Sequence, residues 1–297
     1  MLIGQNCYKC ILNQCADLAI ASASDTAGRN RMLGKYLQTV AEYLETSTPP
    51  EMAEALFRVF YEATGIADPY LEKKLLSTQL AQQLYPEFAA EVAAASDPFI
   101  AALRFTIGGN IIDYGVMPDF DLSTAAAKVR EAADMPLDMS AAAELRQQTA
   151  AAKNIIYLLD NCGEAVFDRL LIDQIGSEKI TLAVRGGAIL NDVTRNELTA
   201  SGLTGMPVID SGSRTPGVSL KTSSPEFLRA IRSADLVIAK GQGNFESLYG
   251  EKDFGNVFFL FRVKCPVLVD FAGVRLNSLQ VKKNSVLRAG CQQSAEK

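Results

Sequence analysis

The spacing of apolar residues changes near residue 150, and this change constrains the fold more than any other feature of the chain. Between residues 7 and 150, apolar residues recur at intervals of three and four in a stretch rich in Ala, Leu, Glu and Gln. This period predicts a series of amphipathic helices, the last of them over residues 141–152. Because a proline disfavours helix in the residue before it, we expect breaks at Pro49-Pro50, 65–69, Pro86 and Pro98.

After residue 153, short apolar runs alternate with helical patterns over 164–175, 195–201 and 225–233. Such alternation predicts an α/β fold whose mostly parallel sheet is covered by helices on both faces. We therefore expect a helical N-terminal domain, residues 1–150, packed on a three-layer α/β/α domain, residues 151–297. The expected strands are 155–159, 180–184, 208–210, 236–239, 257–261 and 267–271.

Composition excludes several classes of function. The 297 residues include no histidine, which rules out Ser-His-Asp triads, Cys-His dyads and histidine zinc sites. The net charge of −5 disfavours a nucleic-acid partner. No apolar run approaches the roughly 18 residues of a membrane helix, and the first residues lack the pattern of a signal peptide. The sequence thus predicts a cytoplasmic protein without a membrane partner, and it does not indicate an oligomeric state.

Polar clusters follow three of the expected strands, where ligands of an open parallel sheet bind. The first is Asp160-Asn161-Cys162-Gly163-Glu164, which offers carboxylate and amide oxygens for a hard cation. The second, residues 185–194, adds Asp192 next to a pair of glycines. Each cluster is also compatible with a plain helix cap, in which Asp or Asn binds backbone N–H groups.

The third cluster, Lys240-Gly241-Gln242-Gly243-Asn244-Phe245-Glu246, follows the expected strand 236–239. Backbone N–H groups at Gly241 and Gly243, with the charge of Lys240, predict a phosphate cradle. It is not a dinucleotide fingerprint, because position 246 is Glu, and it lacks the Walker A spacing. A simple strand-to-helix turn is the alternative. Jointly, the clusters predict a divalent cation at Asp160, Asn161 and Asp192 beside a bound phosphate.

These three motifs, in this order, resemble the signature of the domain-of-unknown-function-89 family of metal-dependent damage-control phosphatases. Three further segments extend the resemblance over almost the whole chain. They are the Gly-Asn-x-x-Asp segment in 108–115, the Cys7-Tyr8-Lys9-Cys10 motif, which is similar to the N-terminus of the prokaryotic subfamily, and Lys264-Cys265-Pro266.

The resemblance implies hydrolysis of phosphate monoesters of small metabolites, such as sugar phosphates, phosphopantetheine-like compounds or damaged metabolites. It implies Mg, Mn, Co or Ni as the cofactor, bound by Asp160, Asn161 and Asp192. Lys240 is expected to contact the substrate phosphate and to act in catalysis with the two aspartates. The other residues expected on the substrate side are Asn110, Asp113, Glu164, Gly241, Gly243 and Asn244.

The expected nucleophile is a water activated by the metal ion, and the leaving alkoxide takes its proton from Asp113, metal-bound water or solvent. A competing route makes Asp160 the nucleophile, as in haloacid-dehalogenase-like phosphatases. That route needs a second Asp two residues later, where this chain has Cys162. An alternative from another class is a sensor that binds a phosphometabolite or nucleotide without turnover.

Six cysteines are too few for a disulfide scaffold in a chain of this length. The spacing of Cys7 and Cys10 is typical of a metal-ligand pair or a redox dithiol, and Cys265 is a candidate third member. We therefore name Cys7, Cys10 and Cys265 as a candidate second metal or redox site. Simple packing of these side chains is an equal alternative.

Overall fold

A six-stranded sheet forms the centre of the protein, as a computed structural model that describes residues 1–111 and 122–285 shows. The strand order is β3-β2-β1-β4-β5-β6. Neighbouring strands are parallel from β3 to β5, and β6 pairs antiparallel with β5. The predicted α/β fold with a mostly parallel sheet is confirmed. The strands are β1 (Ile155–Leu158), β2 (Ile180–Val184), β3 (Val208–Asp210), β4 (Leu236–Lys240), β5 (Val257–Arg262) and β6 (Leu279–Lys283).

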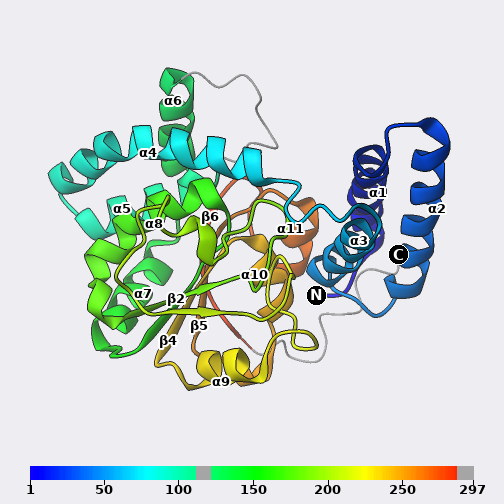
Figure 1. Ribbon diagram of the computed structural model, residues 1–297. Coiled ribbons are helices and arrows are strands. Elements are labelled where there is room, and N and C mark those ends of the chain that lie inside the picture. Colours follow the sequence, from blue (N-terminus) through cyan, green and yellow to red (C-terminus); the bar gives the residue numbers. More distant parts are fainter. Residues whose placement is uncertain (112–121, 286–297) are drawn as a thin grey trace.

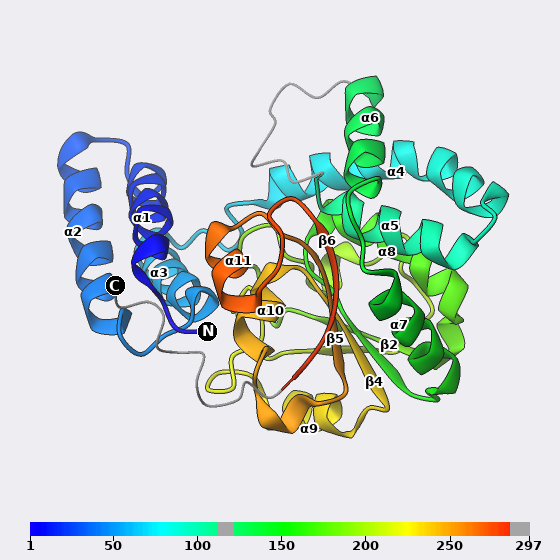
Figure 2. The same ribbon diagram turned by 180° about the vertical axis from the view of Figure 1, so that it is seen from behind.

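Helices cover both faces of this sheet, as predicted (Figures 1 and 2). Because successive strand residues point to opposite faces, Tyr157 and Ile238 pack under one helical layer, whereas Leu158 and Ala239 pack under the other. The first layer contains α5 (Pro98–Gly108), α7 (Met139–Ala151) and α8 (Cys162–Ile175). The second contains α9 (Pro225–Ser233), α10 (Gln242–Leu248) and α11 (Pro266–Ala272).

The strand order also places the site. The chain builds the sheet outward in one direction from β1 and in the other from β4, so these neighbouring strands form the topological switch point. Ligands of such sheets bind in the crevice beyond the carboxyl ends of the strands at this point. Asp160 follows β1, and Lys240 ends β4.

The remaining helices form two further groups. Helices α4 (Leu71–Ala94) and α6 (Leu122–Ala133) pack on α5 and α8 around Phe88 and Phe167. Helices α1 (Tyr8–Ser22), α2 (Thr26–Tyr43) and α3 (Pro49–Thr64) have their own core around Phe57 and Phe60 and lie to one side of the sheet (Figure 1). Each helix within the described ranges is too short or too polar to cross a lipid bilayer.

The periodicity changes where the sequence predicts, since α7 ends at Ala151 and β1 begins at Ile155. The division into domains 1–150 and 151–297 stays a prediction. Helices α5 and α7, from the first of these segments, share a core with α8 and the sheet.

Three local predictions are wrong. Helix α4 continues through Pro86, because Leu84 and Phe88 on either side of it are buried against the rest of the protein. The segment expected as strand 267–271 is helix α11, which has Pro266 at its first turn and ends at Gly273 in the left-handed conformation. The helix expected at 195–201 is a single 3-10 turn, Arg195–Glu197. Strand β6 was not expected from the sequence.

Helix α3 holds the loops that follow β2 and β3. The Glu54 carboxylate accepts hydrogen bonds from the hydroxyls of Thr215, at close range, and Thr222, at 3.0 Å. The Tyr61 hydroxyl donates to the carbonyl of Ala188 at 2.5 Å. Glu51 adds contacts to Ser219 and Lys221. Helix α3 thus supports the loop 211–222, whose Gly217 carbonyl accepts a hydrogen bond from Arg185.

Substitution Glu54→Ala is expected to loosen this loop, because it leaves the buried Thr215 hydroxyl without its carboxylate acceptor. A loss of about 1–2 kcal/mol in local stability corresponds to a roughly 5- to 30-fold larger open population. Limited trypsin digestion should therefore cut faster after the exposed Arg214 and Lys221. Glu62→Ala, at an exposed position of the same helix, is the control. Equal cleavage rates in both variants would show that Glu54 does not hold the loop.

Candidate active site

The end of β1 and the loop after β2 pair with each other through backbone hydrogen bonds. The Val193 N–H donates to the Asp160 carbonyl at 2.8 Å, and the Cys162 N–H donates to the Asn191 carbonyl at 3.0 Å. Asn161 and Asp192 therefore face one another in a short antiparallel bridge. This pairing brings two of the sequence-predicted clusters to one place.

The helix-cap alternatives do not account for these side chains. Asn161 occupies the N-cap of α8, but its side chain makes no capping hydrogen bond. Its Nδ2 donates instead to Asp160 Oδ2 at 3.1 Å. The 3-10 turn after the second cluster is capped by Thr194 with Glu197, not by Asp192.

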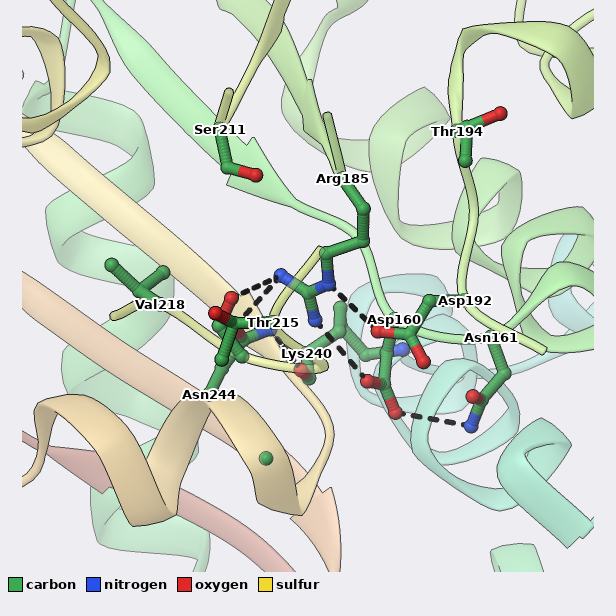
Figure 3. Close-up of polar contacts among 12 residues, drawn as sticks. Asp160, Asn161, Arg185, Asp192, Thr194, Ser211, Thr215, Val218, Lys240 and Asn244 are labelled. Atoms are coloured by element: carbon green, nitrogen blue, oxygen red, sulfur yellow. Dashed lines mark hydrogen bonds and ion pairs between the residues drawn. The ribbon is translucent and has the colours of Figure 1, made fainter. Parts of the chain in front are cut away.

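Arg185 joins the two aspartates (Figure 3). It follows directly after β2, and its guanidinium is fully buried. Nε donates to Asp192 Oδ2 at 2.7 Å, and Nη2 lies 3.6 Å from Asp160 Oδ1. Nη1 donates to the Gly217 carbonyl at 3.0 Å and to Asn244 Oδ1 at 3.1 Å. No role was expected for Arg185 from the sequence, although a charged residue directly after a buried strand is a signal for one.

Lys240 makes a second buried ion-pair group behind the first. As the fifth residue of β4 it points to the same face as Ile238, and this face is covered by α5 and α8. Its Nζ forms a close ion pair with Glu164, lies 2.6 Å from Asp168 Oδ1 and donates to the Thr106 carbonyl at 3.2 Å.

The predicted phosphate contact of Lys240 stays a prediction, because in this structure its ammonium is directed at these three oxygens. Asp168 was not expected from the sequence. Its spacing of four residues from Glu164 on one helix was the available signal, since residues i and i+4 share a helix face.

The charges of this cluster do not balance. When all groups are ionised, Asp160, Glu164, Asp168 and Asp192 carry four negative charges, against two positive charges on Arg185 and Lys240. The cluster is then left with two surplus negative charges in a buried environment.

The pKa values of two carboxyl groups respond to this environment. Burial raises the pKa of Asp160 well above its ordinary value, and the charges of Asp192 and Glu164 raise it further. Burial likewise raises the pKa of Asp168 from 3.8 to about 6, although the ammonium of Lys240 opposes the shift. For Lys240, burial lowers the pKa, but Asp168 and Glu164 raise it more, so the ammonium keeps its proton.

Glycine is required at two positions of the third cluster, because neighbouring atoms lie too close to leave room for a side chain. Gly241 has a φ of 80°, and a Cβ there would lie 1.9 Å from Asp160 Oδ2. A Cβ at Gly243 would lie 2.0 Å from the carbonyl oxygen of Pro216. Asn244, fully buried, donates through Nδ2 to the Lys240 carbonyl at 2.6 Å. Binding of phosphate by this loop stays a prediction.

Asn110 and Lys240 both contact the carboxylate of Glu164. Its Nδ2 donates to Glu164 at close range, and its carbonyl accepts from Lys264 Nζ at 2.9 Å. The structure thus brings Asn110, Glu164 and Lys240 together. Asp113 lies outside the described residues. Substrate binding by these residues stays a prediction.

The cysteines of the candidate second site approach one another but form no complete metal site. Burial raises the pKa of Cys7 and of Cys265, and nearby Glu246 and the Cys10 thiol add to both shifts. Cys7, Cys10 and Cys265 are all free thiols. Within residues 1–111 and 122–285, no three Cys, Asp or Glu side chains are arranged to hold a metal ion. A second metal or redox site at these cysteines stays a prediction.

A cation at the first site, beside Asp160 and Asp192, would need the side-chain oxygen of Asn161 as a further ligand.

Comparison with known proteins identifies the class to which this fold and site belong. The family described as the damage-control phosphatase ARMT1-like domain matches residues 3–279. The chain belongs to this family, which confirms the resemblance seen in the sequence motifs.

Individual relatives span nearly the whole chain. The damage-control phosphatase PH1575 of Pyrococcus horikoshii is 32% identical over 289 residues, which cover 96% of this chain and 99% of that protein. A damage-control phosphatase of Archaeoglobus fulgidus is 27% identical and covers 95% and 99% of the two chains. The crystal structure of PH1575, described as a DUF89 family protein, superposes with a TM-score of 0.85 at 31% identity, covering 96% of this chain and all of that one.

Substitution Gly241→Ala is expected to displace the Asp160 carboxylate and to strain the backbone. We expect it to lower the free energy of unfolding by about 1–3 kcal/mol, measured by urea denaturation. Gly255→Ala is the matched control, because that glycine has a negative φ and open space around it. Equal stability of the two variants would show that Asp160 does not need the close approach to Gly241.

Stability of the metal-free protein should fall as pH rises from about 4 to about 6. The folded protein binds the Asp168 proton more tightly than the unfolded chain, so deprotonation in this window costs stability. Asp168→Asn removes this contribution, and its free energy of unfolding should depend less on pH. Urea titrations in chelator across this range measure both slopes. Asp173→Asn, an exposed carboxylate on the same helix, should keep the wild-type slope; a wild-type slope in Asp168→Asn would contradict the assignment.

Proposed function

We propose that this chain hydrolyses phosphate monoesters of small phosphometabolites with the help of a divalent cation held by Asp160, Asn161 and Asp192. Its membership of the damage-control phosphatase family supports phosphatase activity. The observation that carries the metal dependence is the surplus of two negative charges in the buried cluster. A divalent cation at the aspartates would neutralise that surplus.

The donor atoms fit such an ion. Asp160, Asn161 and Asp192 offer two carboxylates and an amide oxygen, which suit hard cations such as Mg²⁺ or Mn²⁺. The neighbouring Cys162 is buried, and burial strongly raises the pKa of its thiol, so it does not compete as a thiolate ligand. When bound, the cation would supply Lewis acidity at the phosphoryl group and a water of lowered pKa.

The residues around Asp160 and Asp192 stabilise the positions of these two proposed metal ligands. Arg185 offsets the repulsion between the Asp160 and Asp192 carboxylates in the absence of a metal ion. Lys240 performs the same role for Glu164 and Asp168 in the layer beneath. Gly241 allows the β4 loop to close directly onto Asp160. These contacts favour an arrangement that is organised before substrate binds, which is the condition for electrostatic stabilisation of a phosphoryl-transfer transition state.

The substitutions Asp160→Asn and Asp192→Asn test this proposal. Each removes a negatively charged ligand, so hydrolysis of p-nitrophenyl phosphate with added Mn²⁺ should fall about 100-fold or more, and Mn²⁺ binding measured by calorimetry should weaken.

Asp210→Asn is the matched control, because Asp210 also ends a strand at this edge but pairs with Arg195 near the surface. It should keep wild-type activity. Near wild-type hydrolysis by Asp192→Asn would show that Asp192 is not a metal ligand of the active site. Tight binding of phosphate esters without turnover, with Mg²⁺, Mn²⁺, Co²⁺ or Ni²⁺, would favour a sensor instead of an enzyme.

A further inference from the structure

We propose that Arg185 is a substrate-binding residue whose Nη2 donates to a non-bridging phosphoryl oxygen; this inference rests on the proposed phosphatase function. Arg185 carries three nitrogens, and two of them are engaged. Nε donates to Asp192, and Nη1 donates to the Gly217 carbonyl and to Asn244. Nη2 is buried and has no hydrogen-bond partner among the described residues.

An unpartnered Nη2 at this place requires an explanation. Burying a charged donor without an acceptor costs free energy, and native structures seldom leave such a group unsatisfied. The contacts of Nε and Nη1 fix the plane of the guanidinium, so Nη2 cannot turn toward another acceptor while they persist. The neighbouring Asp160 Oδ1 lies at 3.6 Å, beyond hydrogen-bond distance.

The chemistry of Nη2 selects an anionic oxygen as its partner. A guanidinium N–H is a donor only, so a metal ion cannot satisfy it. Guanidinium N–H groups form strong charge-assisted hydrogen bonds with anionic oxygens, and those of a phosphoryl group are the anionic oxygens that a phosphatase substrate brings. Nη2 therefore complements the aspartates, which attract the cation, by offering a hydrogen bond to the anion.

The position of Nη2 places it toward the ligand side of the cluster. It faces Asp160, whose side chain is 11% exposed, whereas the side chains of Arg185 and Asp192 are 0% and 3% exposed. Asp160 is thus the most accessible of the three groups. A phosphoryl group held beside Asp160 would lie next to Nη2.

Lys240 does not supply this hydrogen bond in the described arrangement. Its side chain is fully buried, and its ammonium is directed at Glu164, Asp168 and the Thr106 carbonyl. Among residues 1–111 and 122–285, the guanidinium of Arg185 is thus a cation beside the aspartates that keeps an N–H donor without a hydrogen bond.

The variant Arg185→Lys separates phosphate binding from metal binding, because lysine keeps the positive charge but loses the planar set of donors. Because Arg185 also contacts Asp192, Mn²⁺ affinity is measured first by calorimetry, and phosphate binding is then compared with Mn²⁺ saturating in each protein. Binding of inorganic phosphate to the Mn²⁺-loaded protein should weaken by about 10- to 100-fold, the range expected for one lost charge-assisted hydrogen bond. Phosphate affinity equal to that of wild type would overturn the inference.

Arg104→Lys is the matched control. Arg104 is a half-buried arginine that donates to the carbonyls of Ala133 and Met135 in the helical layer. Both affinities should be unchanged in this variant. A wild-type protein that hydrolyses phosphate esters only with metal, together with unchanged phosphate binding in Arg185→Lys, would reject the inference and leave the proposed function intact. Metal-independent hydrolysis or no phosphate binding by wild type would reject the proposed function and the inference with it.

A crystal structure of the wild-type protein provides a second test if Arg185→Lys does not fold. In a crystal grown with Mn²⁺ and inorganic phosphate, Nη2 should lie about 2.7–3.0 Å from a phosphate oxygen. A phosphate bound at the aspartates but beyond hydrogen-bond distance of Nη2 would overturn the inference.

Discussion

The burial of four carboxylates beside only two cations is the constraint on which this site depends. Isolated charges of one sign are costly in a buried environment, so each carboxylate must be paired, protonated or neutralised by a ligand. Arg185 and Lys240 pair with two carboxylates each. Burial raises the pKa values of Asp160 and Asp168, and the charge of Glu164 adds to both shifts. The proposed divalent cation would neutralise this excess of negative charge at the switch point of the sheet.

Arg185 and Lys240 neutralise different pairs of carboxylates, because their side chains extend from the ends of different strands. Lys240 points from β4 into the layer of α5 and α8, where it neutralises the helix carboxylates. Arg185 follows the end of β2 and contacts both Asp160, after β1, and Asp192, in the loop after β2. The N-terminal helices contribute indirectly, because Glu54 on α3 holds the loop that includes Gly217, and the Gly217 carbonyl accepts from Arg185.

Much of the fold could be predicted from the sequence, because hydrophobic period reports burial on one or both faces of an element. The five parallel strands, α9 and the change near residue 150 follow from it. The errors occurred where packing or a terminal signal outweighed the local pattern. Burial of Leu84 and Phe88 carries α4 through Pro86, and the Pro266 and Gly273 end signals make a helix of an apolar run rich in valine. Strand β6 forms because it pairs with the open edge of β5, which no local pattern reports.

For the site, the strand pattern of the sequence predicts which polar residues gather, since parallel strands bring their carboxyl ends to one edge. Asp160, Asn161, Asp192 and the Lys240 loop follow from that rule, and the composition without histidine excludes histidine chemistry. The tertiary structure alone decided how the charges are paired. Arg185 contacts Asp160 as well as Asp192, and Lys240 contacts Asp168 on α8, which lies 72 residues away in the chain. Local patterns specify where a side chain is attached, whereas its partner is chosen by packing in three dimensions.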